Sequence, residues 1–453
     1  MTTVVYKEVV GETVMNILTN HGSSMINSIF DEDINLDDEF LCNFLDDALI
    51  PKISPTLEIK LPVELTENEL SYFEFYCKQI LPELCILPQE FNFYSKIYVP
   101  MAFKEKAVLY SLVSWGCKVL KNNGLNYLIE NKEANEYVNK VTTTIEINNK
   151  YLTKENFIVN FCCYMALVCM EISFGDVNEW SNYFTSCFNM INKMPGNFKF
   201  LRNCSTEGNL LAENFAYFDV LASQSNENGT FYPISDYHEL FSKNSNAHDP
   251  LQGCLRPIIL LIGEIVTLLV EYSSLQASFD LPECDKYEVI SNMIQKSNDL
   301  DKQIQFTKPD LTCLQFLKTP QELENHLTLF EIFQISAQIY LRQVIKKLPP
   351  VVPEIEMLFF HLKHATTFLV KTPLRKNLGF PMLILGVSAT SKSDRTEVRQ
   401  LFEQLIQSCG YMSGYQKLWI VVQKIWDLNS NGTLYVDWYK VTKQFGWRLN
   451  LGR

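Results

Sequence analysis

The sequence predicts an all-α protein, a large multi-helix globular body with an irregular array of about a dozen helices. Apolar residues recur at helical spacing over most of the chain after residue 65. Only 17 Gly and 18 Pro occur in 453 residues, too few for the turns of a β-sandwich or barrel of this length. The Gly-rich strand-to-helix turn of a doubly wound α/β fold is also absent from the sequence.

The first helix is expected to begin after Thr66. Thr66 and Glu69 have the spacing of a capping box, and Leu70, Phe73 and Leu81 follow along one apolar face. Further helices are expected over residues 154–172, 178–192, 208–223, 254–274, 285–304, 320–348, 353–374, 379–390, 395–408, 413–426 and 436–445.

Pro100 is expected to open the second helix, because proline favours the first helical turn. The apolar face of this helix would then include Ala107, Leu109, Leu112 and Trp115.

The two most apolar windows are residues 157–170 and 257–270. Both windows are too short to span a bilayer, and Glu264 interrupts the second. They are therefore interpreted as buried helices, and no membrane partner is expected.

The chain is expected to consist of an acidic N-terminal tail and linker over residues 1–65 and a helical body over residues 66–450. Residues 1–69 hold fourteen Asp or Glu and three Lys, a net charge of −11, whereas the whole chain carries −13. The remainder is nearly neutral, so neither part offers the basic surface that binds phosphates. No direct nucleic-acid binding by this chain is expected.

Within the tail, Phe40, Leu41, Phe44 and Leu45 lie at helical spacing between pairs of carboxylates. This pattern is typical of a short amphipathic helix packed on the body, the interpretation we favour. It is also typical of an acidic-hydrophobic docking segment, which stays the alternative.

Catalytic and metal sites are not indicated. The thirteen cysteines include no Cys-x-x-Cys pair, and reduced core cysteines are the simplest interpretation. Residues 427–438 imitate a calcium loop but end in Trp438 where a bidentate glutamate is needed, so a turn between helices is expected. His361 and His364 lie one helical turn apart with no third ligand nearby. We expect a protein that is not an enzyme and holds no cofactor of its own.

The strongest enzyme alternative is a terpenoid-synthase-like protein, which would hold magnesium on an Asp-rich helix. Asp37, Asp38, Asp46 and Asp47 invite this comparison. They precede the helical body, however, and a second metal motif is missing, so a solvated acidic face is favoured. A helical scaffold that binds no effector is a further alternative.

Several blocks, taken in order, carry a family resemblance. They are residues 70–84 (LSYFEFYCKQILPEL), 97–120, 166–180 (ALVCMEISFGDVNEW), 214–223 (NFAYFDVLAS), 249–269 (DPLQGCLRPIILLIGEIVTLL), 329–341, 380–389 (FPMLILGVSA) and 421–441. This ordered set resembles the fungal-specific transcription factor domain found downstream of Zn2Cys6 zinc clusters, in the branch of the yeast activators of GABA catabolism and lysine biosynthesis. The positions that match the family's motifs, with structural roles implied, are Gly175, Asp176, Trp180, Asp219, Asp249, Pro250, Gly253, Gly386, Trp426 and Trp438.

The resemblance implies the regulatory, middle-homology-type domain of an RNA polymerase II transcription factor in the nucleus, controlling genes of amino-acid or nitrogen metabolism. It would act through a small-molecule effector, the transcription machinery or another DNA-binding regulator, and a homodimer is left open. The Cys-x2-Cys-x6-Cys array of the family is absent from this sequence. Zinc is therefore expected only in a cluster that this chain lacks, and DNA contact is expected to come from elsewhere.

Overall fold

The computed structural model describes residues 61–88, 91–122, 132–151, 153–224, 226–243, 252–277, 283–409 and 414–452. Within these ranges the secondary structure is helical and includes no strand. The all-α prediction is therefore confirmed.

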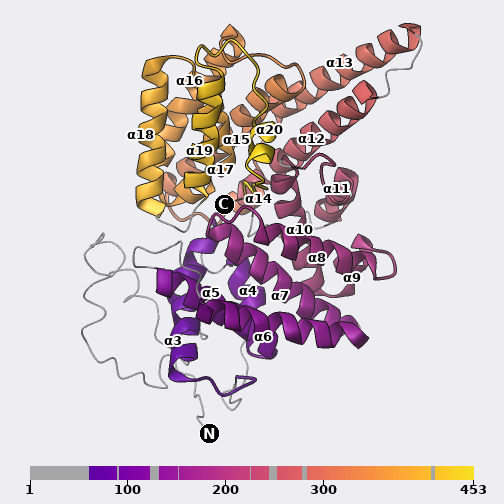
Figure 1. The fold of residues 1–453 in the computed structure, drawn as a ribbon, viewed down its shortest axis with the longest axis vertical. Helices are drawn as coiled ribbons and strands as arrows, with labels where there is room; N and C mark the ends of the chain where they lie inside the picture. Colours follow the sequence, from indigo (N-terminus) through magenta and orange to yellow (C-terminus); the bar gives the residue numbers. More distant parts are fainter. Residues whose placement is uncertain are drawn as a thin grey trace.

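The N-terminal half forms the lower part of the molecule in Figure 1. Helix α5 is central to it and packs against α3, α4, α6 and α7, while α7 also packs against α8 and α10. Its helices are α3 (Glu67–Phe75), α4 (Phe93–Ala102), α5 (Lys106–Asn122), α6 (Lys132–Asn148), α7 (Lys154–Ser173), α8 (Glu179–Asn192), α9 (Phe198–Cys204) and α10 (Thr206–Ser223), with short helices at Tyr76–Ile80, Leu81–Leu84 and Asn149–Tyr151.

The C-terminal half forms the upper part, in which α15 packs against α12, α13, α16 and α17. Helices α12 and α13 lie side by side and project from the body (Figure 1). The helices of this half are α11 (Ile234–Lys243), α12 (Arg256–Ala277), α13 (Glu283–Phe306), α14 (Leu311–Leu314), α15 (Pro320–Val344), α16 (Pro353–Leu369), α17 (Gly379–Ser388), α18 (Lys392–Cys409), α19 (Tyr415–Leu428) and α20 (Trp438–Gln444), with short helices at Gly253–Leu255 and Pro373–Asn377.

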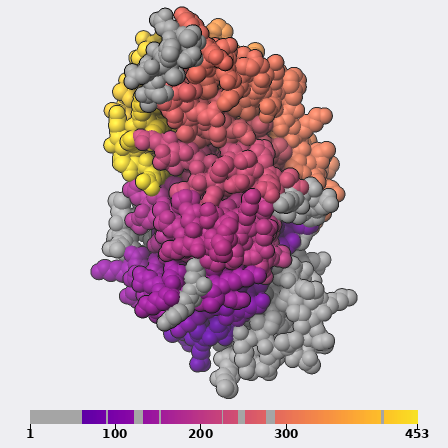
Figure 2. Space-filling view, turned by 90° about the vertical axis from the view of Figure 1, so that its right-hand side faces the viewer, coloured from indigo at the N-terminus to yellow at the C-terminus, as the bar shows by residue number. Residues whose placement is uncertain are grey.

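After α20 the chain returns to the N-terminal half and ends near the middle of the molecule (Figure 1). The Arg448 N–H donates to the Val177 carbonyl over 2.7 Å, and the Leu451 N–H donates to the Leu221 carbonyl over 3.2 Å. In Figure 2 the yellow C-terminal residues accordingly lie against the magenta middle of the chain. Residues 446–452 are called the C-terminal segment below.

The two halves share one hydrophobic core, which runs from Tyr72 to Leu451. Helix α7 and residues 253–275 are each long and apolar enough to cross a bilayer, so the expectation that these stretches are too short was wrong about their length. However, 83% and 72% of their apolar windows are buried inside the protein. They are core helices, as the sequence predicted.

Most helix positions agree with the periodicity of the sequence. The capping box at Thr66 is present, because the Glu69 N–H donates to the Thr66 hydroxyl and the Thr66 N–H donates to the Glu69 carboxylate. The expectation at Pro100 was wrong, since Pro100 lies inside α4 and the next helix begins at Lys106. Asn92 caps α4 well before the proline, and a proline near a helix end removes only one backbone donor.

Helix α6 was not predicted, because its sequence is rich in β-branched residues that disfavour helix. Its buried side chains are Ala134, Tyr137, Val141 and Ile145, which form one face at helical spacing. Packing of this face against α5 outweighs the weak local propensity.

A substitution at Gly386 can test how closely the helices of the upper half pack. A Cβ atom on Gly386 would lie 2.4 Å from Cγ2 of Val422, where α17 crosses α19. We therefore expect Gly386→Ala to lower the free energy of unfolding by about 1–3 kcal/mol through overpacking. Chemical denaturation checks this value.

Glu403→Ala on the exposed face of α18 is the control, expected to change stability by less than about 0.5 kcal/mol. Equal stability of Gly386→Ala and the native protein would contradict the close approach of the two helices.

Candidate functional site

The turn between α7 and α8 positions one of the motif tryptophans. Gly175 ends α7 with φ of +66°, a conformation that favours glycine. The Asp176 carboxylate accepts hydrogen bonds from the N–H groups of Asn178 (2.9 Å) and Trp180 (3.0 Å) and so holds the start of α8. The Trp180 indole Nε1 then donates to the Arg448 carbonyl over 2.9 Å.

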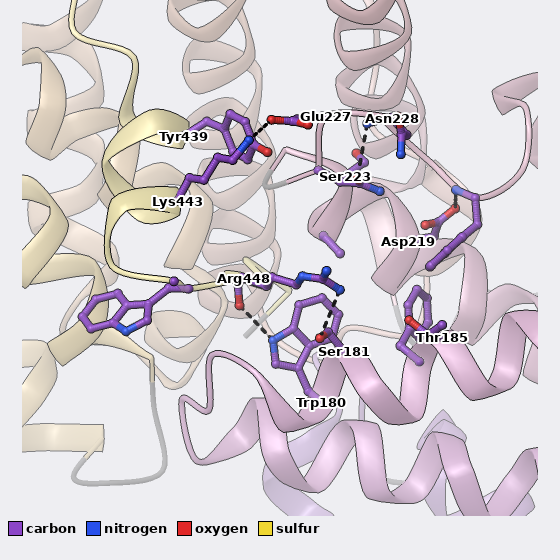
Figure 3. A pocket seen from close by; sticks show the side chains of 16 residues that line it. Trp180, Ser181, Thr185, Asp219, Ser223, Glu227, Asn228, Tyr439, Lys443 and Arg448 are labelled. Atoms are coloured by element: carbon purple, nitrogen blue, oxygen red, sulfur yellow. Dashed lines mark hydrogen bonds and ion pairs between the residues drawn. The ribbon is translucent and has the colours of Figure 1, made fainter.

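Trp180 forms part of a cleft of about 500 Å³ between α8, α10, α20 and the C-terminal segment, named the Trp180 cleft (Figure 3). Its volume lies in the range of small-molecule sites. Aromatic rings and hydroxyl, amide and charged groups share its walls. The lining residues are Trp180, Ser181, Phe184, Thr185, Asp219, Ala222, Ser223, Asn226, Glu227, Asn228, Phe231, Tyr439, Lys443, Gly446, Trp447 and Arg448.

Arg448 supplies a cation to this cleft. Its Nη1 lies 3.5 Å from the Ser181 hydroxyl, a long contact, and the side chain extends over Trp180 in Figure 3. No carboxylate of the described residues lies within 4.0 Å of the guanidinium. A guanidinium without an ion-pair partner can bind the carboxylate of a small molecule in bidentate geometry.

Asp219 is a buried carboxyl in the wall of the same cleft, 2% exposed. It accepts hydrogen bonds from the Tyr237 hydroxyl and, over 2.8 Å, from the Phe231 N–H. Burial raises the pKa of Asp219 to about 7, although these hydrogen bonds oppose the shift. Asp219 therefore joins α10 to the segment that leads into α11.

A second cleft of about 770 Å³ lies between α12, α15 and α20 and is named the Gln224 cleft. Ser223, Asn226, Glu227 and Tyr439 line both clefts. Its other lining residues are Gln224, Val266, Leu269, Val270, Ser273, Tyr340, Val344, Lys347, Leu428, Tyr435, Val436, Asp437, Trp438, Lys440, Val441 and Gln444.

The Glu227–Lys443 ion pair bridges the loop after α10 to α20 at the upper rim of the Trp180 cleft (Figure 3). Both side chains are largely exposed, so the pair contributes little to stability. This exposed ion pair lies in the wall where the two clefts meet.

The remaining motif residues have varied surroundings. Gly253 has φ of +54° at the start of a short helix. The Trp426 indole Nε1 donates to the Gly386 carbonyl over 2.8 Å, and Trp438 is buried at the start of α20 in the wall of the Gln224 cleft. Asp249, Pro250 and the segment of Phe40, Leu41, Phe44 and Leu45 lie outside the described residues.

Residues 429–437 connect α19 to α20 as a turn, in agreement with the sequence. The Asn429 side chain is bonded within this loop, since its Nδ2 donates to the Leu434 carbonyl and its Oδ1 accepts from the Leu434 N–H. His361 and His364 lie on the exposed side of α16. The described part of the chain contains no group of three or more His, Cys, Asp or Glu residues placed to hold a metal ion.

Cys162, Cys163 and Cys187 are fully buried, and burial raises the pKa of each thiol. These are the properties of core cysteines and not of nucleophiles. The four aspartates of the terpenoid-synthase alternative, Asp37, Asp38, Asp46 and Asp47, lie outside the described residues.

Trp180, Asp219 and Trp438 are motif positions in the sequence and line the clefts in the structure. Three further lining residues were not predicted, namely Arg448, Gln224 and Lys347. Each of these three comes from a different part of the chain. No local pattern distinguishes them from other polar residues, and only the folded structure brings them to the clefts.

The raised pKa of Asp219 gives a pH dependence of stability. Between pH 3.8, the ordinary pKa, and about pH 7, the folded state keeps a proton that the unfolded chain releases. Stability contributed by Asp219 is therefore present at low pH and falls as the pH rises through this window. The free energy of unfolding of Asp219→Asn should therefore increase relative to that of the native protein as the pH rises. Between pH 4 and pH 7.5 we expect this relative gain to reach up to roughly 4 kcal/mol.

Urea denaturation of both proteins across this pH range measures the difference. Glu207→Gln, at an exposed carboxyl in the first turn of α10, should show no such trend. If the difference in free energy of unfolding between Asp219→Asn and the native protein does not change with pH, Asp219 is charged in the folded state and the expectation is wrong.

The comparisons with known proteins agree with one another. The profile of the fungal specific transcription factor domain matches residues 71–452. An uncharacterized transcriptional regulatory protein of Schizosaccharomyces pombe, C965.10, is 40% identical over 391 residues, which cover 86% of this chain and 72% of that protein. The transcriptional activator protein UGA3 of Saccharomyces cerevisiae is 22% identical over 441 residues, covering 88% of this chain and 80% of that protein. No solved structure matches. The chain belongs to the family of fungal specific transcription factor domains, and its relatives are transcriptional regulators.

Proposed function

We propose that this chain is the regulatory domain of a nuclear transcription factor that controls genes of amino-acid or nitrogen metabolism, and that a small-molecule effector bound in the Trp180 cleft sets its activity. The family match over residues 71–452 carries the regulatory part of the proposal. The relative UGA3 is named a transcriptional activator, which supports activation as the output.

The Trp180 cleft supports the effector part of the proposal. Its walls offer the Arg448 guanidinium for a carboxylate, and a ligand ammonium group could replace Lys443 in the exposed ion pair with the Glu227 carboxylate. Ser223 and Asn228 offer further hydrogen-bonding groups between them. A small amino acid or a related zwitterion matches this distribution of charge and polarity.

The position of the cleft supports a regulatory consequence of binding. The Trp180 cleft has walls from α8 and α10 of the N-terminal half and from α20 and the C-terminal segment. A ligand that contacts both sides favours the conformation in which the two halves are closed on each other. Partner proteins of the transcription machinery would then bind one conformation better than the other.

A non-enzymatic role agrees with the chemistry of this cleft. The Ser181 hydroxyl donates to the Asn178 carbonyl over 2.7 Å, and no histidine is among the lining residues that could activate it as a nucleophile. The docking role of residues 40–45 and a homodimer stay predictions.

An effector should raise the unfolding temperature of the protein. We expect one or more compounds from a panel of amino acids and their metabolic intermediates to produce a dose-dependent rise in a thermal-shift assay. Arg448→Ala should weaken binding of that compound about tenfold to a hundredfold, because it removes a charge-assisted interaction.

Lys392→Ala, at an exposed lysine of α18 outside both clefts, is the control and should respond like the native protein. The same compound should change reporter expression in cells that carry the native protein and not in cells that carry Arg448→Ala. If no compound raises the unfolding temperature, or if Arg448→Ala responds normally, the effector part of the proposal fails.

A further inference from the structure

The exposed face of helix α16 carries a row of apolar and aromatic side chains. Met357 is 57% exposed, Phe360 53% and Phe368 41%. His361 and His364 lie on the same face and are also exposed. At about 3.6 residues per turn, these five positions fall within about 100° of the helix circumference. They therefore form one continuous row along the helix, named the α16 row.

The α16 row takes no part in the packing of the core. Helix α16 lies in the upper part of the molecule (Figure 1) and packs against α15 and α17 with its other face. The buried side chains of that face are Ile355, Phe359, Leu362, Thr366 and Leu369. Lys363, beside the row, is held by ion pairs with Asp394 and Glu397 of α18. Single exposed apolar residues are ordinary, whereas a continuous row of them indicates a contact surface.

The two ends of the α16 row carry opposite charges. Glu354 lies in the first turn of α16, where it is exposed and forms an ion pair with Arg342. Lys371 lies just after the end of the helix and is exposed. No carboxylate of the described residues lies within 4.0 Å of the Lys371 Nζ. The face is therefore acidic at one end, apolar and aromatic along its length, and basic at the other end.

We propose that the α16 row is a self-association surface, on which α16 of a second copy of this chain packs in antiparallel orientation. In the register centred between residues 362 and 363, Met357 faces Phe368 of the second copy and His361 faces His364 of the second copy. A two-fold axis repeats each contact, as an interface between identical surfaces requires.

The charges at the ends of the row favour a second copy as the occupant. The same register sets Glu354 of each copy against Lys371 of the other, so opposite charges meet at both ends. A parallel pair would set Glu354 against Glu354 and Lys371 against Lys371. A partner helix with charge of one sign would match only one end. Glu354 can keep its ion pair with Arg342, because a carboxylate accepts from more than one donor.

This surface goes beyond the proposed function, because it requires no ligand in either cleft. A single pair of helices buries less area than a standard interface, which covers about 1,600 Å² in total. The dimer should therefore be weak, with a dissociation constant of about 1–100 µM. Sedimentation equilibrium of the full chain, over concentrations that bracket this range, measures the association.

The double variant Phe360→Ser/Phe368→Ser tests the apolar part of the surface. It should raise the dissociation constant about tenfold or more, because both copies lose apolar contacts. Both side chains are exposed, so the fold should persist, and circular dichroism checks this. Ile294→Ser on α13 is the matched control, since Ile294 is 56% exposed and lies on another helix. It should dimerise like the native protein.

Two charge reversals test the antiparallel orientation. Glu354→Lys or Lys371→Glu alone sets like charges against each other at both ends and should raise the dissociation constant about fivefold or more. A mixture of these two variants sets opposite charges together at both ends, so the mixed dimer should form about as tightly as the native one. Glu403→Lys, at an exposed position of α18, controls for the change in net charge and should have no effect.

The proposal is overturned if the native protein stays monomeric over this concentration range. It is also overturned if Ile294→Ser weakens the dimer and the α16 variants do not, or if Glu354→Lys dimerises like the native protein. Failure of the mixture to dimerise would have the same consequence. Arg448→Ala should dimerise normally, because Arg448 belongs to the Trp180 cleft, so failure of this proposal is distinguishable from failure of the effector proposal.

Discussion

The closure of the C-terminal segment onto the N-terminal half is the interaction on which the Trp180 cleft depends. The hydrogen bonds that hold it include those from the Arg448 N–H to Val177, from the Trp180 indole to Arg448, from the Leu451 N–H to Leu221, from the Tyr217 hydroxyl to Gly452 and from the Asn450 side chain to Phe218. Without this contact, α20 and residues 446–448 would not face α8 and α10, and the Trp180 cleft would lose one wall. A ligand that contacted both sides of this cleft would therefore stabilise the closed arrangement.

The buried carboxyl of Asp219 lies on α10 next to Phe218, whose carbonyl accepts a hydrogen bond from Asn450 of the C-terminal segment. The carboxyl itself accepts from the Phe231 N–H in the segment before α11 and from the Tyr237 hydroxyl in α11. A neutral carboxyl suits this position, because no cation of the described residues lies within 4.0 Å of it. The same buried acid thus joins three parts of the chain.

How well each feature could be predicted from the sequence depends on how far apart in the sequence its interacting residues lie. Helices such as α7, α12 and α15 have long apolar faces, and local periodicity located them to within a few residues. Helix α6 and Pro100 were misjudged because tertiary packing outweighs local propensity there. Arg448 could not be found at all, since its place in the Trp180 cleft depends on contacts with a segment more than two hundred residues away.

The wall between the clefts gives a physical route for communication between them. It contains Ser223, Asn226, Glu227 and Tyr439, and the ion pair from Glu227 to Lys443 is exposed to solvent. An exposed pair of this kind is easily broken, whereas Trp438 and Val441 keep α20 packed in the core. A ligand in one cleft that altered the contacts of these shared side chains would change the affinity of the other cleft, and the free energy of this coupling would be the same in both directions. The shared wall, with α20 on one side and the loop after α10 on the other, is therefore the place where ligands in the two clefts would be coupled.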